Sequence, residues 1–324
     1  MFCARCKVMN KNNVKNDIKS VVDNCIGIKV FFLDKFNNIF DSDIDNTALH
    51  EYKQKYVSSI KETFADNLGF ECLPLSQNDG RPNALYFYDF DDRLAELDAI
   101  DTAHTLPANK TLEAYPVKHS GLSDVHAVIV RLKSSNGETM SFYNLIQPVN
   151  LFKHKSRLMV TFSGNRIVPI SEDVIRLNEN FIFARVKDYY LVKDATKFEK
   201  DFAFDKILKS KAKEYVVELK SMSLVECCNK FESKLENDIR FARKFVKIFN
   251  GSAVVENNIS NEKLIDYALK HPVFKDKLKF NEDGSKFDLN SLVRCDNFLK
   301  LLDEEFLISE LTRQNYHAKV KDRV

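Results

Sequence analysis

The feature that most constrains the fold of this chain is a succession of β-hairpins in its middle third. From Asp124 onward, short segments rich in apolar residues are separated by turn residues. The first pair of segments is VHAVIVRL and ETMSFYNLI, joined by KSSNG, and the second is RLMVTF and RIVPI, joined by SGN. Extended segments joined by a short turn with Gly or Asn are typical of β-hairpins. This part of the sequence therefore predicts an antiparallel sheet.

A third pair of segments indicates that part of the sheet is covered on both faces. In ENFIFARV and YYLVKD, joined by a tight KD turn, apolar residues fall on both sides of the strand. We expect the helical C-terminal third of the chain to provide the cover. The N-terminal part has a mixed pattern, with strands predicted at 27–33 and 84–90 and a helix at 47–67. The sequence thus predicts an α+β fold, with an acidic mixed α/β region (1–118) followed by the antiparallel sheet and C-terminal helices (119–324).

Helices in the C-terminal third are predicted from capping and periodicity. Thr196 and Glu199 have the spacing of a capping box, so a helix is expected to begin there. A longer helix is predicted from Leu224 to Asn250, with Gly251 as its C-terminal cap. At about 100° per residue, its apolar residues project within an arc of roughly 80°. This core face consists of Phe231, Leu235, Ile239, Ala242, Val246 and Phe249.

Three cationic clusters are candidates for contact with a polyanion. The first lies on the far side of the longer helix and consists of Arg240, Arg243, Lys244 and Lys247. The second lies in the segment LFKHKSRL and consists of Lys153, His154, Lys155 and Arg157. The third consists of Lys206, Lys209, Lys211 and Lys213, of which the last three are the proposed contacts. If two clusters meet in the fold, several phosphates would be neutralised at once and binding would depend strongly on salt.

The stability of the helix itself is an alternative explanation for the cations of the first cluster. Cations in the last turns of a helix are favoured by its dipole, by roughly 0.3 to 1 kcal/mol each. The charge of the whole chain is nevertheless uneven, because residues 34–98 hold 14 acidic and 6 basic side chains, a net of −8. Residues 206–247 hold 11 basic and 6 acidic side chains, a net of +5. Such a surface suits a polyanion on its basic part and a protein partner on its acidic part, although both regions are also compatible with plain solvated surface.

One short motif leaves an enzyme as the alternative. In YVVELKS, Glu218 and Lys220 resemble the second half of a PD-(D/E)xK nuclease motif, in which an acid and a lysine at a strand end bind Mg²⁺ and activate water. The upstream acid would have to be Asp201 or Asp205, and both fall in a predicted helix. Signatures of nucleotide-binding loops, zinc proteases and serine hydrolases are absent from the sequence. We therefore expect no catalytic residues.

No metal or cofactor site is predicted. The seven cysteines are odd in number and scattered, which favours reduced thiols. Cys3 and Cys6 have half the spacing of a zinc site but lack a second pair of ligands. No apolar stretch approaches the about 20 residues of a membrane span, so we expect a cytoplasmic protein.

Two segments in the second half of the chain resemble a known family. One is NFLKLLDEEFLISELTRQNYHAKVKDRV, with a Leu-Leu pair, an acidic doublet and a SELT motif. The other is VIRLNENFIFARVKDYYLVKDATKFEKDFAF, in which two strands lead into FEKDF. Together they resemble the KwaB-like family, the soluble DNA-binding subunit of the two-component Kiwa anti-phage defence system. The resemblance covers residues 124–320, and its motifs are mostly apolar, so they identify the family better than they identify a site.

The resemblance implies a non-enzymatic function. Members of the family are homodimers that bind phage DNA, block its replication and late transcription, and pair with a small multi-span membrane protein. By this resemblance the chain would be a cytoplasmic effector that its partner recruits to the inner face of the membrane. No catalytic group and no cofactor is carried over, and the proposed DNA contacts are those of the three cationic clusters. A Mg²⁺-dependent nuclease and a protein-only adaptor are the alternatives.

Overall fold

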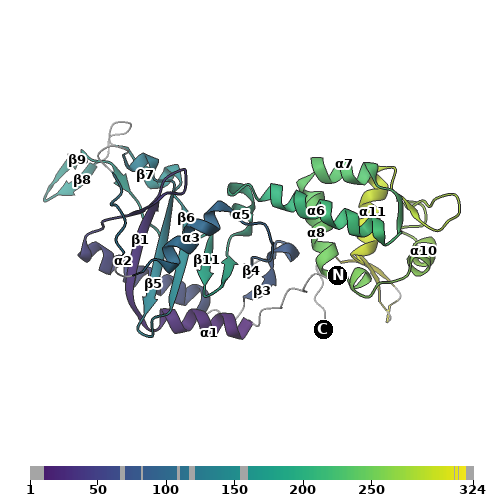
Figure 1. Cartoon of the computed structure of the whole chain (residues 1–324), viewed down its shortest axis with the longest axis horizontal. Coiled ribbons are helices and arrows are strands. Elements are labelled where there is room, and N and C mark those ends of the chain that lie inside the picture. Colours follow the sequence, from purple (N-terminus) through teal and green to yellow (C-terminus); the bar gives the residue numbers. More distant parts are fainter. Residues whose placement is uncertain are drawn as a thin grey trace. The chain divides into compact units, whose positions relative to one another are not determined.

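The chain folds into two compact units, each of which is described by itself. The computed structural model describes residues 11–65, 70–81, 83–107, 110–116, 121–153, 160–309, 311–312 and 314–318. Unit 1 comprises Met1–Leu75 and Pro82–Phe202, and unit 2 comprises Ser76–Arg81 and Ala203–Val324. The predicted α+β class is confirmed, because a large, mostly antiparallel sheet is combined with helices that are concentrated in the C-terminal part (Figure 1).

An eight-stranded sheet forms the centre of unit 1, in the order β2–β1–β5–β6–β11–β12–β4–β3. Neighbouring strands are antiparallel, except for the parallel pair β3 and β4. The strands are β1 (Cys25–Leu33), β2 (Ile39–Asp41), β3 (Glu71–Pro74), β4 (Ala84–Phe87), β5 (Ala127–Ser134), β6 (Thr139–Leu145), β11 (Phe183–Val186) and β12 (Tyr189–Val192). The sequence predicted a division near residue 118, but strands from both sides of this position share one sheet. The units divide at Phe202 and Ala203 instead.

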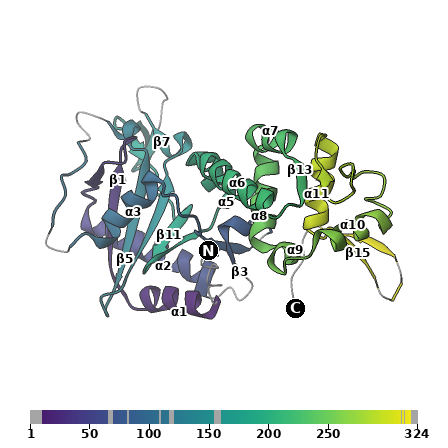
Figure 2. The same cartoon turned by 45° about the vertical axis from the view of Figure 1, so that its right-hand side comes forward.

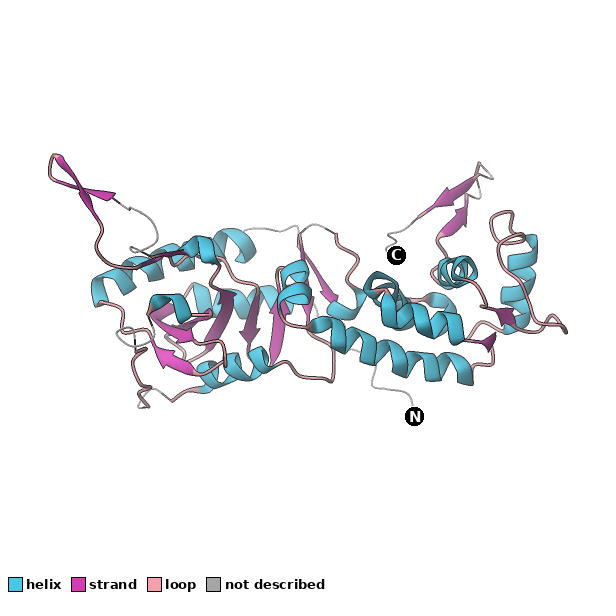
Figure 3. Ribbon diagram, turned by 90° about the horizontal axis from the view of Figure 1, so that it is seen from above, coloured by secondary structure: helices cyan, strands magenta, loops and turns pink. Residues whose placement is uncertain are grey.

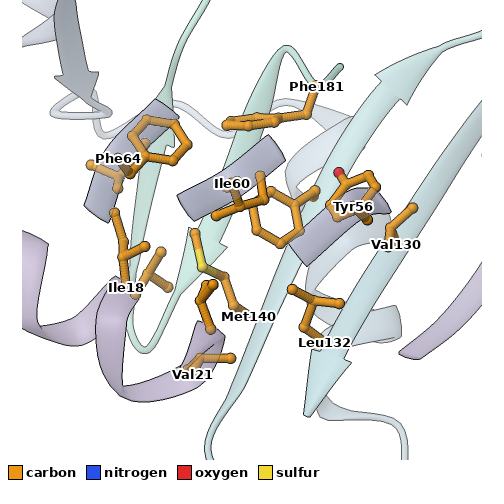
Figure 4. Packing of buried hydrophobic residues seen from close by; sticks show 14 of the residues in the cluster. Ile18, Val21, Tyr56, Ile60, Phe64, Val130, Leu132, Met140 and Phe181 are labelled. Carbon is orange, nitrogen blue, oxygen red and sulfur yellow. The ribbon is translucent and has the colours of Figure 1, made fainter. Parts of the chain in front are cut away.

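N-terminal helices cover one face of this sheet. They are α1 (Lys11–Val22) and α2 (Asn46–Ile60), which continues into a π-helical turn, Lys61–Ala65. The carboxylate of Asp45 accepts hydrogen bonds from the backbone N–H groups of the first turn of α2, which fixes where this helix begins. Figure 4 shows buried side chains of the helices and of the strands packed together: Ile18, Val21, Tyr56, Ile60, Phe64, Val130, Leu132 and Met140.

The opposite face is covered by α3 (Ala95–Thr105) and by α5 (Ala195–Asp201). Phe183 of β11 is fully buried there, and its ring lies 4.8 Å from that of Tyr143 on β6. The rings of Phe198 and Phe202 pack against Phe183 at 5.5 and 5.7 Å. The prediction that the C-terminal third covers the sheet is largely wrong for unit 1. Most of the cover within this unit comes from α1, α2 and α3, and α5 is the contribution from the later part of the chain, since α6 and the helices that follow it belong to unit 2.

The start of α5 differs in detail from the predicted capping box. Asp194, rather than Thr196, is the N-cap, and its carboxylate accepts a hydrogen bond from the N–H of Lys197 at 3.0 Å. Aspartate and threonine cap helices by the same chemistry, so either residue satisfies the free N–H groups of the first turn.

Unit 2 is mainly helical (Figure 2), and it has an aromatic core of its own. Its helices are α6 (Phe204–Ser221), α7 (Asn229–Asn237), α8 (Ile239–Gly251), α9 (Ala253–Glu256), α10 (Asn261–Lys270) and α11 (Leu292–Leu302). Short strands pair between them: β13 (Val225–Cys227) with β14 (Phe287–Asp288), and β15 (Phe306–Ile308) with β16 (Asn315–His317). The ring of Phe231 on α7 lies 5.0 Å from that of Phe245 on α8 and 6.4 Å from that of Phe298 on α11.

The single long helix predicted from Leu224 to Asn250 is wrong. Its first residues form the strand β13, α7 begins only at Asn229, and a break at Asp238 separates α7 from α8. There the backbone is extended, and the carboxylate accepts hydrogen bonds from the N–H groups of Arg240 and Phe241. An aspartate that caps a new helix competes with the helix that precedes it. Gly251 is the last residue of α8 rather than a cap beyond it.

The second predicted hairpin is present, but it forms a sheet of its own. It consists of β8 (Val160–Ser163) and β9 (Arg166–Pro169), which pair only with each other in the described residues. The hairpin projects from the body of unit 1 (Figure 3). Nearby along the chain, β7 (Leu151–Phe152) pairs with β10 (Val174–Ile175). Within the described ranges, none of the helices combines the length and the apolar character that crossing a bilayer requires.

Candidate nucleic-acid interface

The first cationic cluster follows one side of α8, as its spacing predicted. Arg240, Arg243, Lys244 and Lys247 occupy positions i, i+3, i+4 and i+7, which are neighbours on a helix surface. The sequence of α8, IRFARKFVKIFNG, contains no acidic residue. Arg240 is exposed, whereas the other three cations are half-buried. Their availability to a ligand therefore depends on what lies against each of them.

Lys244 is used inside unit 2. Its ammonium group donates a hydrogen bond to Glu305, whose side chain is only 5% exposed. The same carboxylate lies 3.0 Å from the Nε2 atom of His317 on β16. Burial on its own would raise the pKa of Glu305, but the hydrogen bonds from Lys244 and His317 outweigh burial and lower this pKa. Glu305 is therefore ionised at neutral pH, and Lys244 compensates its charge.

The end of α8 lies near an acidic residue from a distant part of the sequence. The segment Ser76–Arg81 belongs to unit 2, and Gln77 donates a hydrogen bond to the carbonyl of Asn250 at 3.4 Å. Burial would raise the pKa of Asp79 in this segment, but hydrogen bonds from Arg81 and the charges of Arg81 and Lys247 lower it. Lys247 thus interacts with an aspartate that already pairs with an arginine.

Arg240 is the most available cation of the cluster. Within the described part of the chain it forms no ion pair, and its side chain is exposed at the first turn of α8. Asp238, two residues earlier, directs its carboxylate to backbone N–H groups instead. We therefore rank Arg240 first among the candidate contacts on α8.

The third cluster is split between two sides of α6. Lys211 lies about 200° around the helix from Lys209, since each residue turns the helix by about 100°. It forms an ion pair with Glu214 at 2.9 Å, and its ammonium lies 5.4 Å from the centre of the Tyr215 ring. Lys211 is therefore held against its own helix.

Lys209 and Lys213 line a groove of about 510 Å³ between α6 and α7. Glu232 and Glu236 of α7 line the same groove, and Glu236 forms an ion pair with Lys213 at 3.1 Å. A groove in which cations and carboxylates alternate does not attract a polyanion as strongly as a continuous positive surface. The cluster on α6 therefore supports DNA binding less well than the cluster on α8.

The second cluster lies in unit 1. Lys153 is exposed at the end of β7 and lines a cleft of about 860 Å³, together with the aromatic side chains of Phe36, Tyr115 and Phe152. Lys155 and Arg157 lie outside the described residues. The cluster thus contributes one described cation, at the edge of a cleft with aromatic walls.

The residues of the nuclease motif lie on a helix. Glu218 and Lys220 are in the last turns of α6, and Lys220 donates a hydrogen bond to Glu232 of α7. The upstream candidates are also helical, Asp201 on α5 and Asp205 on α6. Among the residues that the structure describes, no three potential metal ligands of the His, Cys, Asp or Glu type lie together. The motif requires an acid and a lysine at the end of a strand, whereas Glu218 and Lys220 lie on a helix. The geometry therefore does not favour a nuclease.

Sequence reasoning missed Glu305 as a partner of the basic cluster. The available signal was that the acidic run Asp303 to Glu305 lies between apolar residues in LLDEEF, and an acid buried next to an apolar residue needs a cation. The sequence did not show which lysine would supply it.

Comparison with known proteins identifies the family. A family model described as "Kiwa protein KwaB-like" matches residues 122–312, which is more than half of the chain. The chain belongs to this family. It is also 27% identical over 328 residues to the Kiwa protein KwaB of Escherichia coli O55:H7, across 98% of the chain and 99% of that relative. No solved structure matches the chain significantly.

The resemblance read from the sequence is thereby confirmed, and the chain is a KwaB component of the Kiwa anti-phage defence system. The matched region begins just before β5 and ends just after β15, so it includes α6, α8 and Glu305. The similarity to the Escherichia coli relative extends through the N-terminal strands and helices as well.

Proposed function

We propose that this KwaB-like chain acts in anti-phage defence as a DNA-binding protein without catalytic activity. The observation that carries the proposal is the cationic side of α8, a helix with no acidic residue of its own, on which Arg240 is exposed. Arg243 and Lys247 lie on the same side and are half-buried, with Lys247 close enough to Asp79 to lower its pKa. Lys and Arg side chains contact phosphates irrespective of base sequence. A protein of this kind would act by occupying phage DNA and so obstruct its replication and transcription.

Assembly would strengthen such binding. The resemblance to its family implies a homodimer and a small multi-span membrane partner. In a dimer, binding of the first copy raises the effective concentration of the second site, so weak contacts add up without any new interaction. Recruitment by the partner would hold the protein at the inner face of the membrane.

Removal of three cations from α8 is expected to weaken DNA binding. The change Arg240→Ala, Arg243→Ala, Lys247→Ala should lower the affinity for duplex DNA tenfold or more at low salt. Each lost phosphate contact should also reduce the slope of log affinity against log salt by about 0.9. A gel-shift titration at several salt concentrations measures both quantities.

A matched control removes the same charge elsewhere in unit 2. Lys270, Lys275 and Lys279 are exposed, and alanine at all three should leave affinity and salt slope nearly unchanged. Equal affinity of the α8 variant and the wild type would place the DNA site elsewhere.

Two results would favour the alternative functions. An affinity of the wild type for DNA no better than that of an unrelated protein of similar charge would favour a protein-only adaptor. Mg²⁺-dependent cleavage of DNA that Glu218→Ala abolishes would favour the nuclease.

Acidic residues of unit 1 are the candidates for docking on the membrane partner, since cytoplasmic loops of membrane proteins carry excess Lys and Arg. Asp91 and Asp92, after β4, are exposed, whereas Asp41 on β2 forms an ion pair with Lys29 at 2.9 Å. Five strands separate β2 from β4, so these acids lie roughly 29 Å apart at about 4.8 Å per strand. They form two separate surfaces rather than one.

We expect the surface after β4 to matter more. Asp91→Asn with Asp92→Asn should reduce co-purification of the membrane partner several-fold, because two exposed charges are lost, while Asp41→Asn with Asp43→Asn should reduce it less. Quantitative pull-down at two salt concentrations provides the measurement. If both double variants retain the partner like the wild type, acidic docking is not the mode of association.

A further inference from the structure

Two side chains that can carry positive charge share one buried carboxylate beside α8. The Oε1 atom of Glu305 accepts a hydrogen bond from Lys244, and its Oε2 atom lies 3.0 Å from Nε2 of His317. The side chain of Glu305 is 5% exposed, whereas those of Lys244 and His317 are 31% and 43% exposed. The carboxylate therefore lies inside unit 2, while both of its partners reach the surface.

The β15–β16 pair fixes the position of His317. This residue lies opposite Phe306 in the register of the two strands, and the two rings stack with their centres 4.9 Å apart. One position further along, the N–H of Ala318 donates a hydrogen bond to the carbonyl of Glu305 at 2.7 Å. The backbone pairing thus holds the imidazole next to the carboxylate.

The charge of this group of side chains depends on one proton. An ionised carboxylate only accepts hydrogen bonds, so a neutral imidazole must carry its hydrogen on Nε2 to donate to Glu305. The charges of Lys244 and Glu305 then cancel. Histidine is the side chain that ordinarily gains its charge between about pH 8 and pH 5, by taking up a proton on the second ring nitrogen. With that proton, His317 compensates Glu305 as well, and the group carries a surplus positive charge.

Other titratable groups near the β15–β16 pair do not replace His317 in this range of pH. The ring of His271 lies 6.0 Å from that of Phe306, and burial lowers the pKa of His271, so it gains charge later than an ordinary histidine as pH falls. Burial and the charge of Glu304 raise the pKa of Tyr267 on α10, which therefore stays protonated. Among the described contacts of the His317 ring, Glu305 is the charged partner, and Lys244 binds the same carboxylate.

We propose that protonation of His317 releases Lys244 from Glu305 and makes Lys244 a contact for a DNA phosphate, so that the protein binds DNA more tightly as pH falls. The imidazolium provides a charge-assisted hydrogen bond to Glu305 in place of the one from Lys244. Lys244 is four residues from Arg240 on the same side of α8, so the released ammonium extends the cationic surface. This inference rests on the proposed DNA binding and adds its regulation by pH.

The sign and the size of the effect follow from linkage. The form that binds DNA with Lys244 carries one proton more than the form that does not, so affinity rises as pH falls, by at most about tenfold per pH unit. DNA must in turn favour the protonated form of His317 by the same factor. One additional phosphate contact should also steepen the slope of log affinity against log salt by about 0.9.

The experiment measures DNA affinity at two values of pH. The full chain is titrated into a fluorescently labelled duplex at several salt concentrations, at about pH 8 and about pH 6. The wild type should bind roughly fivefold to tenfold more tightly, and with the steeper salt slope, at the lower pH. His317→Gln keeps a hydrogen-bond donor for Glu305 but takes up no proton, so its affinity should be nearly equal at both. His126→Gln removes an exposed histidine of unit 1 and should behave like the wild type.

A second variant tests the release of Lys244 directly. Glu305→Gln removes the charge that holds Lys244, so this variant should bind DNA at the higher pH as tightly as the wild type does at the lower pH, and its affinity should no longer depend on pH. A purely structural role of Glu305 would not raise the affinity. His317→Gln changes an exposed side chain and tests the inference even if Glu305→Gln does not fold.

The outcomes separate this inference from the proposed function. Equal pH dependence in the wild type and in His317→Gln, or a wild type whose affinity does not change with pH, overturns the inference and leaves DNA binding by α8 intact. A pH dependence that persists in the double variant Lys244→Gln with Glu305→Gln also overturns it, because protonated His317 would then contact DNA itself. Failure of the wild type to bind duplex DNA at either pH overturns both the inference and the proposed function.

Discussion

Alanine in place of Lys244 is expected to lower the free energy of unfolding of unit 2 by about 3 kcal/mol. The side chain of Glu305 is 5% exposed, and Lys244 is the cation that donates to it from α8. Loss of one partner of a buried ion pair leaves a charge that is neither solvated nor compensated, which costs far more than loss of a surface pair. Urea denaturation followed by circular dichroism measures the change.

The pH dependence of this effect has a defined sign. In the folded wild type the pKa of Glu305 is lowered below its usual value, so its interactions stabilise the fold above the glutamate range and are lost as pH falls through the folded pKa. Without Lys244, only His317 remains to oppose the effect of burial, so Glu305 is more easily protonated. The difference in stability between wild type and Lys244→Ala should therefore be largest at neutral pH and shrink below about pH 4.

Two comparisons identify the cause. Glu305→Gln added to Lys244→Ala removes the uncompensated charge and should recover most of the lost stability. Lys270→Ala removes a lysine whose partner Asp266 is exposed, and it should lower the free energy of unfolding by less than about 0.5 kcal/mol. A loss below about 1 kcal/mol at neutral pH would mean that Lys244 is not structural and is available for DNA after all.

The strands of the large sheet followed from local pattern. Apolar-rich segments at Ala127–Ser134 and Thr139–Leu145, with a turn that contains glycine between them, predicted the β5–β6 hairpin. The same kind of pattern over Val160–Ser163 and Arg166–Pro169 predicted the next hairpin equally well. It did not show that this hairpin stands apart from the large sheet, because a hairpin pattern describes a strand and its nearest partner but not what packs on their faces.

The candidate site was predicted in part for a similar reason. The spacing of Arg240, Arg243, Lys244 and Lys247 fixes their common side of α8, which local periodicity determines. Which of these charges is compensated depends on residues far away in the sequence, such as Glu305 and Asp79. The break at Asp238 was accessible, since aspartate is a strong N-cap, but a continuous apolar stripe on both sides concealed it.

Alanine in place of Phe183 is expected to lower the free energy of unfolding of unit 1 by about 3 to 5 kcal/mol. Phe183 is fully buried at the centre of an aromatic cluster, stacked on Tyr143 and in edge contact with Phe198 and Phe202. Its loss removes the transfer free energy of the ring and leaves a cavity between the sheet and α5 that rigid aromatic neighbours cannot fill. Urea denaturation gives the magnitude.

The aromatic cluster also holds α5 on the sheet. Phe183→Ala should therefore affect amide hydrogen exchange in α5 more than elsewhere in unit 1. Amide hydrogens of α5 should exchange faster in Phe183→Ala than those of α1, which packs on the other face through Ile18 and Val21. Phe183→Leu fills most of the volume of the ring and should lower the free energy of unfolding by roughly 1 kcal/mol. Phe36→Ala changes a side chain that is 73% exposed and should lower it by less than about 0.5 kcal/mol. Equal loss of protection in α1 and α5 would contradict the local role, because it would mean that both faces of the sheet open together and that the aromatic cluster does not hold α5 separately.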